Sequence, residues 1–214
     1  MTNRSSSGLG SGASDAEGAA AVRHVRQRLE SALAPRPGAA DSPAPEALPA
    51  SFESRGGVFV TLRTAEDGEL RGCVGFPRAA LPVRVGLGDA ALAAATEDPR
   101  FPPVGAGELP ELTIEVSLLS APERLGGRTP EDRLKEVRVG VDGLIVEADG
   151  TSGLLLPQVA VEQRWGAREF LEATCTKAGL RTDRWRSPEA TIYRFQSAVF
   201  AEERPGGPVR RVLG

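Results

Sequence analysis

The sequence contains the stretch Leu70-Arg71-Gly72-Cys73-Val74-Gly75, which joins a thiol, a guanidinium and two glycines in consecutive positions. Glycines on both sides of Cys73 let the backbone turn sharply, and they let another molecule come close to the sulfur. Arg71 would favour the thiolate form of its neighbour. The alternative is that Cys73 is a small buried residue in a strand that ends in a glycine turn. The residue types alone leave both interpretations open.

The residues before this stretch predict a β-hairpin. Residues 57–63 alternate as a strand does, with Val58, Val60 and Leu62 on one face. The pair Asp67-Gly68 then favours the positive φ of a tight turn. The return strand is expected to run from Glu69 into Cys73. The thiol is therefore predicted at a strand end or just past it.

Working outward, the remaining chain divides into helical and strand patterns joined by glycine and proline turns. Residues 1–15 hold little besides serine, glycine and alanine, and they are predicted to be a disordered tail. The proline-rich residues 35–50 are expected to form an extended connector. Helical spacing is found in residues 19–33, 83–96, 130–137 and 167–178. Strands are predicted at residues 112–119, 143–148, 153–156 and 192–202, and Gly206 and Gly207 are expected to release a short tail.

A second candidate for chemistry is the loop Glu97-Asp98-Pro99-Arg100-Phe101-Pro102-Pro103. Prolines fix φ, so the loop would hold its polar groups in place at little entropic cost. The plainer interpretation is a rigid connector with a surface contact between Asp98 and Arg100. Glu115, on the polar face of the strand at residues 112–119, is expected to meet solvent or a cleft.

Composition excludes several classes of function. A net charge of -3 and a pI near 5.4 argue against a general nucleic-acid binder. No apolar run approaches the roughly 20 residues that span a bilayer, so we expect a cytosolic protein that does not bind membranes. Cys73 and Cys175 are then expected to be free thiols, Cys175 as part of the core. The single histidine, His24, argues against a zinc site and a Ser-His-Asp hydrolase, and we expect neither metal nor cofactor.

Taken together, several motifs resemble the AMMECR family. They are LRGCVG at 70–75, AAATEDPRFPPV at 93–104, LTIEVSLLS at 112–120, VGVDGLIVE at 139–147 and SGLLLPQVA at 152–160. The resemblance extends from about residue 16 to the end, and it is strongest to the archaeal-type members. It departs from the family pattern at Arg164, where a glycine or other small residue often precedes the tryptophan.

The resemblance implies an α+β fold, largely antiparallel, in which residues 16–214 form one folding unit with a larger and a smaller lobe and a cleft between them. It also implies that the Arg-Gly-Cys motif is the functional site. Prokaryotic members are often encoded beside, or fused to, a Memo-like protein and a radical S-adenosylmethionine protein, a grouping called AmmeMemoRadiSam. The resemblance does not imply a reaction.

Two hypotheses of function follow. In the first, the chain is an enzyme or enzyme component in which Cys73 is the nucleophile or redox thiol. Arg71 assists the thiol or holds an anionic substrate, and Glu97, Asp98 or Glu115 moves protons.

In the second hypothesis, the chain is a non-catalytic module that binds a small molecule or docks onto a partner. A substrate or ligand would contact Gly72, Gly75, Arg100 and Phe101 in either case. If the motif is structural, Arg71 is expected to pair with a carboxylate such as Asp98 or Glu115. A regulatory role linked to nucleic acid is a third, weaker alternative.

Overall fold

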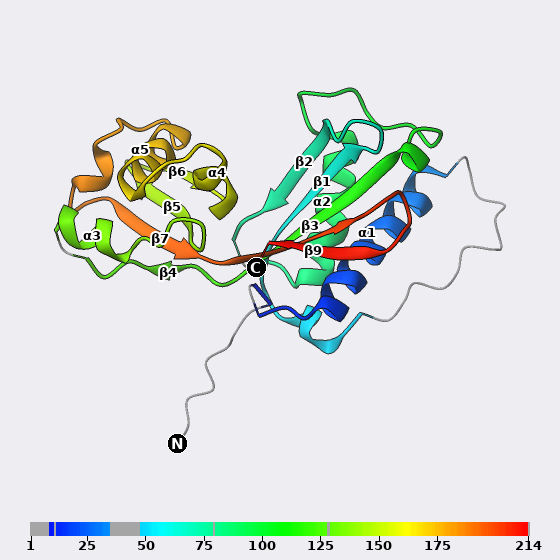
Figure 1. Ribbon diagram of the computed structural model, residues 1–214, viewed down its shortest axis with the longest axis horizontal. Coiled ribbons are helices and arrows are strands. Elements are labelled where there is room, and N and C mark those ends of the chain that lie inside the picture. The colour runs from blue at the N-terminus through cyan, green and yellow to red at the C-terminus, as the bar shows by residue number, and fades with distance from the viewer. Residues whose placement is uncertain (1–8, 11, 35–47, 79, 128, 214) are drawn as a thin grey trace, which may run out of the picture. The chain divides into compact units, whose positions relative to one another are not determined.

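The computed structural model describes residues 9–10, 12–34, 48–78, 80–127 and 129–213. The chain forms two compact units: Met1–Leu119 with Ala198–Gly214 make the first, and Ser120–Ser197 make the second. Each unit has its own antiparallel sheet with helices packed on it, as Figure 1 shows. The predicted α+β class is confirmed. The connector predicted at 35–50 lies almost wholly outside the described residues.

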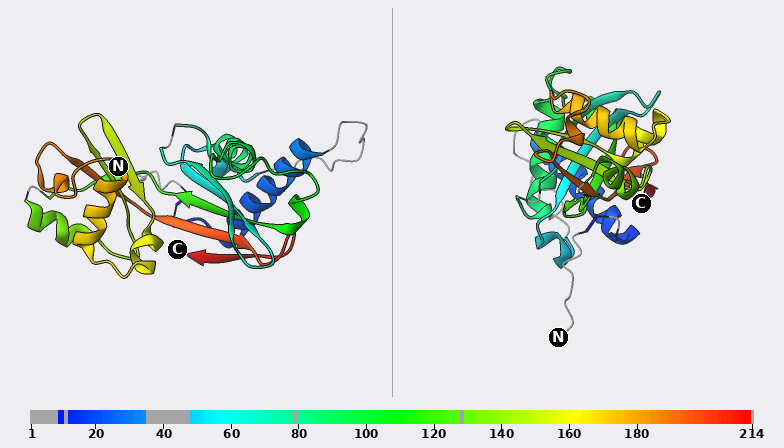
Figure 2. Two further views of the ribbon diagram at one scale, coloured as in Figure 1. Left: turned by 90° about the horizontal axis from the view of Figure 1, so that it is seen from above. Right: turned by 90° about the vertical axis from the view of Figure 1, so that its left-hand side faces the viewer.

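The first unit contains a five-stranded sheet in the order β2-β1-β3-β8-β9. Its strands are β1 (Gly57–Thr64), β2 (Leu70–Phe76), β3 (Leu112–Leu119), β8 (Ser197–Glu202) and β9 (Val209–Leu213). Two helices, α1 (Asp15–Leu33) and α2 (Val83–Thr96), pack on each other and against this sheet. Figure 2 shows both helices on the same side of the sheet. Short 3-10 turns occur at Ala50–Glu53 and Leu109–Glu111.

The core of the first unit lies between the sheet and its two helices. Strand β3 confirms the predicted alternation, because Leu112, Ile114, Val116 and Leu118 are all fully or almost fully buried. Val58, Val60 and Leu62 of β1 join the same cluster. Residues between these positions point to the other face of the sheet, since successive side chains of a strand alternate. Cys73 therefore lies on the face of the sheet that points away from the helices.

Helix α1 begins earlier than the sequence predicted. Ser14 caps its start, and the N–H of Glu17 donates to the Ser14 hydroxyl while the Glu17 carboxylate accepts from Ser14 N–H. Leu9 and Ala13 are buried in the core. The tail predicted at residues 1–15 therefore includes folded residues, because Leu9 and Ala13 belong to the core and Asp15 begins α1. Residues 1–8 and 11 lie outside the described residues.

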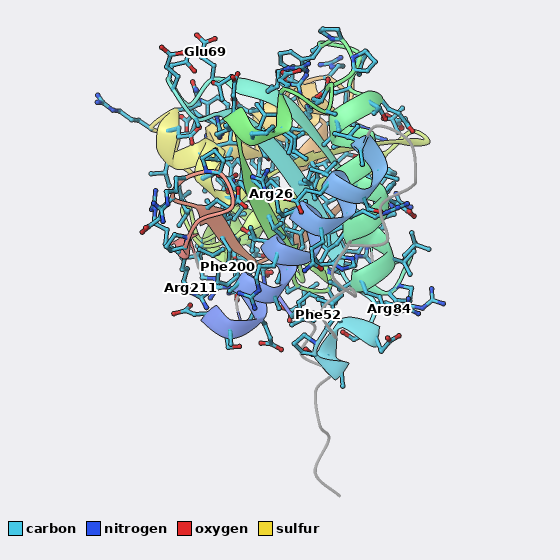
Figure 3. The ribbon with its side chains drawn as sticks, turned by 90° about the vertical axis from the view of Figure 1, so that its right-hand side faces the viewer. Arg26, Phe52, Glu69, Arg84, Phe200 and Arg211 are labelled. Atoms are coloured by element: carbon cyan, nitrogen blue, oxygen red, sulfur yellow. The ribbon has the colours of Figure 1, made fainter. Side chains whose placement is uncertain are left out.

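The C-terminal segment is a strand and not the released tail that the glycines suggested. Strand β9 pairs with β8, and Arg211 contacts both the Asp15 carboxylate and the Phe200 ring. Figure 3 shows Phe200 and Arg211 beside the start of α1. A Cβ on Gly18 would lie 2.1 Å from the Phe200 ring, so glycine allows the helix to pack closely there.

The second unit contains a four-stranded sheet in the order β4-β7-β5-β6. Its strands are β4 (Glu123–Arg124), β5 (Gly143–Ala148), β6 (Thr151–Leu155) and β7 (Thr191–Phe195). Its helices are α3 (Pro130–Glu136), α4 (Pro157–Glu162), α5 (Ala167–Lys177) and a 3-10 turn at Arg184–Arg186. Phe170, Cys175 and Trp185 are buried in its core, which confirms the prediction for Cys175.

The strand predicted at residues 192–202 is two strands. β7 ends at Phe195 and belongs to the second sheet, whereas β8 begins at Ser197 and belongs to the first. Alternation continues through both segments, so the pattern alone did not reveal the change of sheet. Arg164 has a positive φ of 57°, a conformation that favours glycine. None of the described helices is both long enough and apolar enough to cross a membrane.

Candidate functional site

Cys73 lies in the middle of β2, so its predicted place at a strand end is wrong. Strand β2 continues to Phe76, and Cys73 is opposite Thr61 while Gly75 is opposite Phe59. The two glycines serve close packing instead of a turn. A Cβ on Gly72 would lie 2.1 Å from the carbonyl oxygen of Ala94 in α2. A Cβ on Gly75 would lie 2.2 Å from the Phe59 ring.

Cys73 is part of a row of three side chains across the sheet. Thr61 is the partner of Cys73 on one side and of Glu115 on the other. The Thr61 hydroxyl donates a hydrogen bond to Cys73 Sγ at 3.4 Å. Cys73 and Glu115 are partly exposed, whereas Thr61 is buried. The sheet register therefore brings Cys73 and Glu115 to one face, with a hydroxyl group between them.

Asp98 occupies the open edge of the sheet beside Cys73. Strand β2 is an edge strand, and the backbone N–H of Cys73 donates to Asp98 Oδ2 at 2.8 Å. Asp98 also accepts two hydrogen bonds from the Arg100 guanidinium, from Nε at 2.9 Å and from Nη2 at 2.6 Å. These bonds from Arg100, outweighing the opposite effect of burial, hold the pKa of the Asp98 carboxyl well below its usual range. Asp98 is therefore ionised at neutral pH.

Arg71 pairs with Glu108, a carboxylate that the sequence analysis did not name as its partner. Its Nε and Nη2 donate to the two carboxylate oxygens of Glu108, the second at 3.1 Å. The guanidinium carbons of Arg71 and Arg100 lie 5.8 and 5.4 Å from the centre of the Phe101 ring. No sequence pattern pointed to Glu108, because this residue follows a glycine-containing loop that has no periodicity.

We use the name Cys73 cluster for Cys73 together with the residues that these contacts join to it, namely Thr61, Arg71, Asp98, Arg100, Phe101 and Glu108. The structure brings the predicted Cys73, Asp98, Arg100 and Phe101 together, and adds Thr61 and Glu108, which the sequence analysis missed. Regular alternation indicated that Thr61 faces away from the core, but nothing in the sequence paired it with Cys73.

The candidate Glu97 and the single histidine, His24, lie apart from these contacts. Glu97 is exposed at the C-terminal end of α2, where its backbone N–H donates to Ala93. His24 lies on α1 against Gly88 of α2, on the helix side of the sheet. Burial above all lowers the pKa of His24. In the part of the chain that the structure describes, no group of three or more histidine, cysteine or acidic residues is placed to hold a metal ion.

Comparison with known proteins connects this chain and its fold to a family. The AMMECR1 family model matches residues 21–200. A protein of Thermococcus gammatolerans is 49% identical over 193 residues, 89% of this chain and 92% of that protein. A protein of Methanothermobacter thermautotrophicus is 48% identical over 187 residues, 87% of this chain and 95% of that protein.

A solved structure has the same fold. The crystal structure of an uncharacterized protein of Pyrococcus horikoshii, PH0010, matches with a TM-score of 0.79 and 42% identity, and the match covers 94% of this chain and 98% of that chain. The resemblance that the motifs suggested is thus confirmed by the family match, by the relatives and by the fold. The chain belongs to the AMMECR1 family.

Proposed function

We propose that this protein is a module that binds a small molecule at the exposed side of the Cys73 cluster. The supporting observation is the pairing of the charged groups, since Arg100 holds Asp98 and Arg71 holds Glu108. Both carboxylates are engaged in hydrogen bonds and are not available to move protons. Asp98 in particular stays ionised because Arg100 lowers its pKa. Such a rigid cluster with balanced charges suits recognition better than acid–base catalysis.

The exposed atoms of the cluster indicate what such a ligand contacts. Cys73 and Phe101 are partly exposed residues, and the Arg100 side chain is 53% exposed. They offer a polarisable atom, an apolar ring and a cation on one side of the sheet. A small molecule with a flat apolar part and oxygen atoms would match these three groups.

A cysteine-dependent enzyme, or a component of one, is the second candidate. The hydrogen bond from the Thr61 hydroxyl to Cys73 Sγ favours it, because a donor at this position stabilises a thiolate. In this case Cys73 attacks the substrate as a nucleophile. Glu115 belongs to the same row of side chains and is the carboxylate that this mechanism would use.

We expect an alkylating reagent to label Cys73 well before Cys175 in the native protein. Cys73 is partly exposed on the sheet, whereas Cys175 is fully buried and its pKa is raised by burial. Mass spectrometry of peptides after timed reaction with iodoacetamide measures both rates. A Cys73→Ser variant, which should remain folded, supplies the control. Equal labelling of the two thiols, or none at Cys73 before unfolding, would contradict an accessible cluster.

Native mass spectrometry of the protein incubated with a metabolite extract tests the proposal itself. Binding predicts a non-covalent complex that Arg100→Gln weakens and that Cys73→Ser retains, since the thiol is one contact among several. Arg168→Gln is the matched control, because Arg168 is exposed on α5 of the second unit. Turnover or a covalent adduct that depends on Cys73 would support the enzyme instead. A complex that survives Arg100→Gln unchanged would reject this site.

The partners implied by the resemblance remain proposals. A Memo-like protein and a radical S-adenosylmethionine protein are the two candidates that the family grouping supports. A docking role and a ligand-binding role are compatible, since a bound small molecule could be passed to either partner. Co-purification from a cell that encodes all three proteins would reveal such a complex.

A further inference from the structure

The second unit contains a buried arginine without a carboxylate partner. Arg133 of α3 is 7% exposed, and its guanidinium donates only to backbone carbonyl groups. Nε donates to Gly127 at 3.3 Å, Nη1 to Trp185 and to Ser187, the latter at 2.9 Å, and Nη2 to Ala190 at 3.1 Å. Across the described ranges, the structure shows no ion pair for Arg133. The dipoles of these backbone carbonyl groups therefore stabilise its positive charge, and no carboxylate of the described residues neutralises it.

A second arginine adds to this positive charge. Arg124 of β4 is exposed, and no hydrogen bond or ion pair joins its side chain to the residues that the structure describes. Burial first, and the charge of Arg124 second, lower the pKa of Arg133. Holding two guanidinium groups near each other is unfavourable unless an anion is present.

Both arginines line one cavity of about 490 Å³ in the second unit, together with Gly126, Gly127, Pro188 and Ile192. The elements around it, β4, α3 and β7, can be followed in Figure 1. The volume falls in the range of pockets for small organic ligands, roughly 300–1,000 Å³. Its wall combines two cations with apolar side chains, which is the composition expected for a small molecule with one anionic group.

Four carboxylates that lie close in the chain to the cavity-lining residues have other partners. The Glu136 carboxylate accepts from the N–H of Gly126 at 2.9 Å, and the Asp132 carboxylate accepts from the N–H of Thr129 at 3.3 Å. Glu189 interacts with Ser187 and Arg184. Glu123, which precedes Arg124, lies 3.3 Å from Arg194. None of these four forms an ion pair with Arg124 or Arg133 among the described residues.

We propose that this cavity is an oxyanion site that binds a phosphate or carboxylate group of a small molecule. Arg133 is held rigidly by four carbonyl groups and keeps one Nη2 N–H for the ligand, because that nitrogen carries two hydrogens and only one bond is present. Arg124 supplies the second set of donors from the open side. Leu125 and Ile192 contact the apolar remainder. The site belongs to the second unit and is independent of the Cys73 cluster.

Isothermal titration with inorganic phosphate, and separately with acetate, tests this site at constant ionic strength adjusted with chloride. Thermal unfolding in the same solutions gives a second readout. Wild-type protein should bind phosphate, and Arg124→Gln should weaken binding by about 10–100-fold, the effect of losing a charge-assisted hydrogen bond. Arg124 is exposed, so this variant should remain folded. The matched control, Arg168→Gln, removes an exposed arginine from α5 and should bind phosphate like the wild type.

The two anions distinguish the ligand class. Binding of phosphate alone supports a phosphorylated ligand, and binding of both supports a general oxyanion site. The proposal is overturned if chloride stabilises the wild type as much as phosphate does. It is also overturned if Arg124→Gln and Arg168→Gln bind phosphate with equal affinity.

Discussion

Arg26→Met should lower the free energy of unfolding by about 3–5 kcal/mol, because it leaves a buried carboxylate without its partner. Arg26 of α1 is 8% exposed, and its Nε and Nη2 donate to the two oxygens of Glu202, at 3.1 and 2.5 Å. Its guanidinium also donates to the carbonyl groups of Leu109 and Leu112. Figure 3 shows Arg26 on α1, among the side chains at the centre of that view.

Urea denaturation followed by circular dichroism measures this effect. Arg28→Met on the exposed face of the same helix is the matched control, and it should change stability by no more than about 0.5 kcal/mol. The double variant Arg26→Met, Glu202→Leu should recover part of the loss, since it removes the unpaired charge. A loss below about 1 kcal/mol in Arg26→Met would show that the pair is not important for stability.

The partner of Arg26 could not be predicted from the sequence. Helical spacing in residues 19–33 predicted an apolar stripe of Val22, Val25, Leu29 and Leu33; the first three are fully buried, and Leu33 is partly buried against the core. Arg26 belongs to the same stripe but counted as a polar residue between apolar ones. Glu202 is 176 residues away, so only the pairing of strands in the folded sheet brings the two together.

The elements that were predicted well have strong local signals. Helix α2 has the predicted limits, residues 83–96. Between the two strands predicted at 143–148 and 153–156, the pair Asp149-Gly150 forms a turn with positive φ angles of 52° and 78°, which such a pair favours. The errors occur where a local pattern permits two outcomes. Gly72 and Gly75 could have formed a turn, and the structure uses them for close packing instead. The alternation through residues 192–202 fitted one strand or two.

The candidate site was predicted in part for the same reason. The residue types at 71–75 and at 98–101 indicated chemistry, and the fold joins these segments through the hydrogen bond from Cys73 N–H to Asp98. Thr61 and Glu108 could not be found, because their contacts depend on strand register and on the path of a loop. The roles of these residues remain predictions that the labelling and binding experiments test.

Ile114→Ala should lower the free energy of unfolding by about 2–5 kcal/mol, because it removes three carbon atoms from a fully buried position and leaves a cavity. Ile114 lies on β3, opposite Leu62 of β1, on the face that packs against the helices. Its backbone N–H donates to Glu202, so the side chain can be truncated without loss of this hydrogen bond.

Thr113→Ala on the same strand is the control that makes this a test of register. Thr113 faces the opposite side of the sheet from Ile114 and is only partly buried, so its truncation should change stability by less than about 1 kcal/mol. A slip of β3 by one residue would exchange the two faces and move Glu115 away from the Cys73 row. Denaturation curves for both variants therefore check the core and the candidate site together. A larger loss for Thr113→Ala than for Ile114→Ala would contradict both.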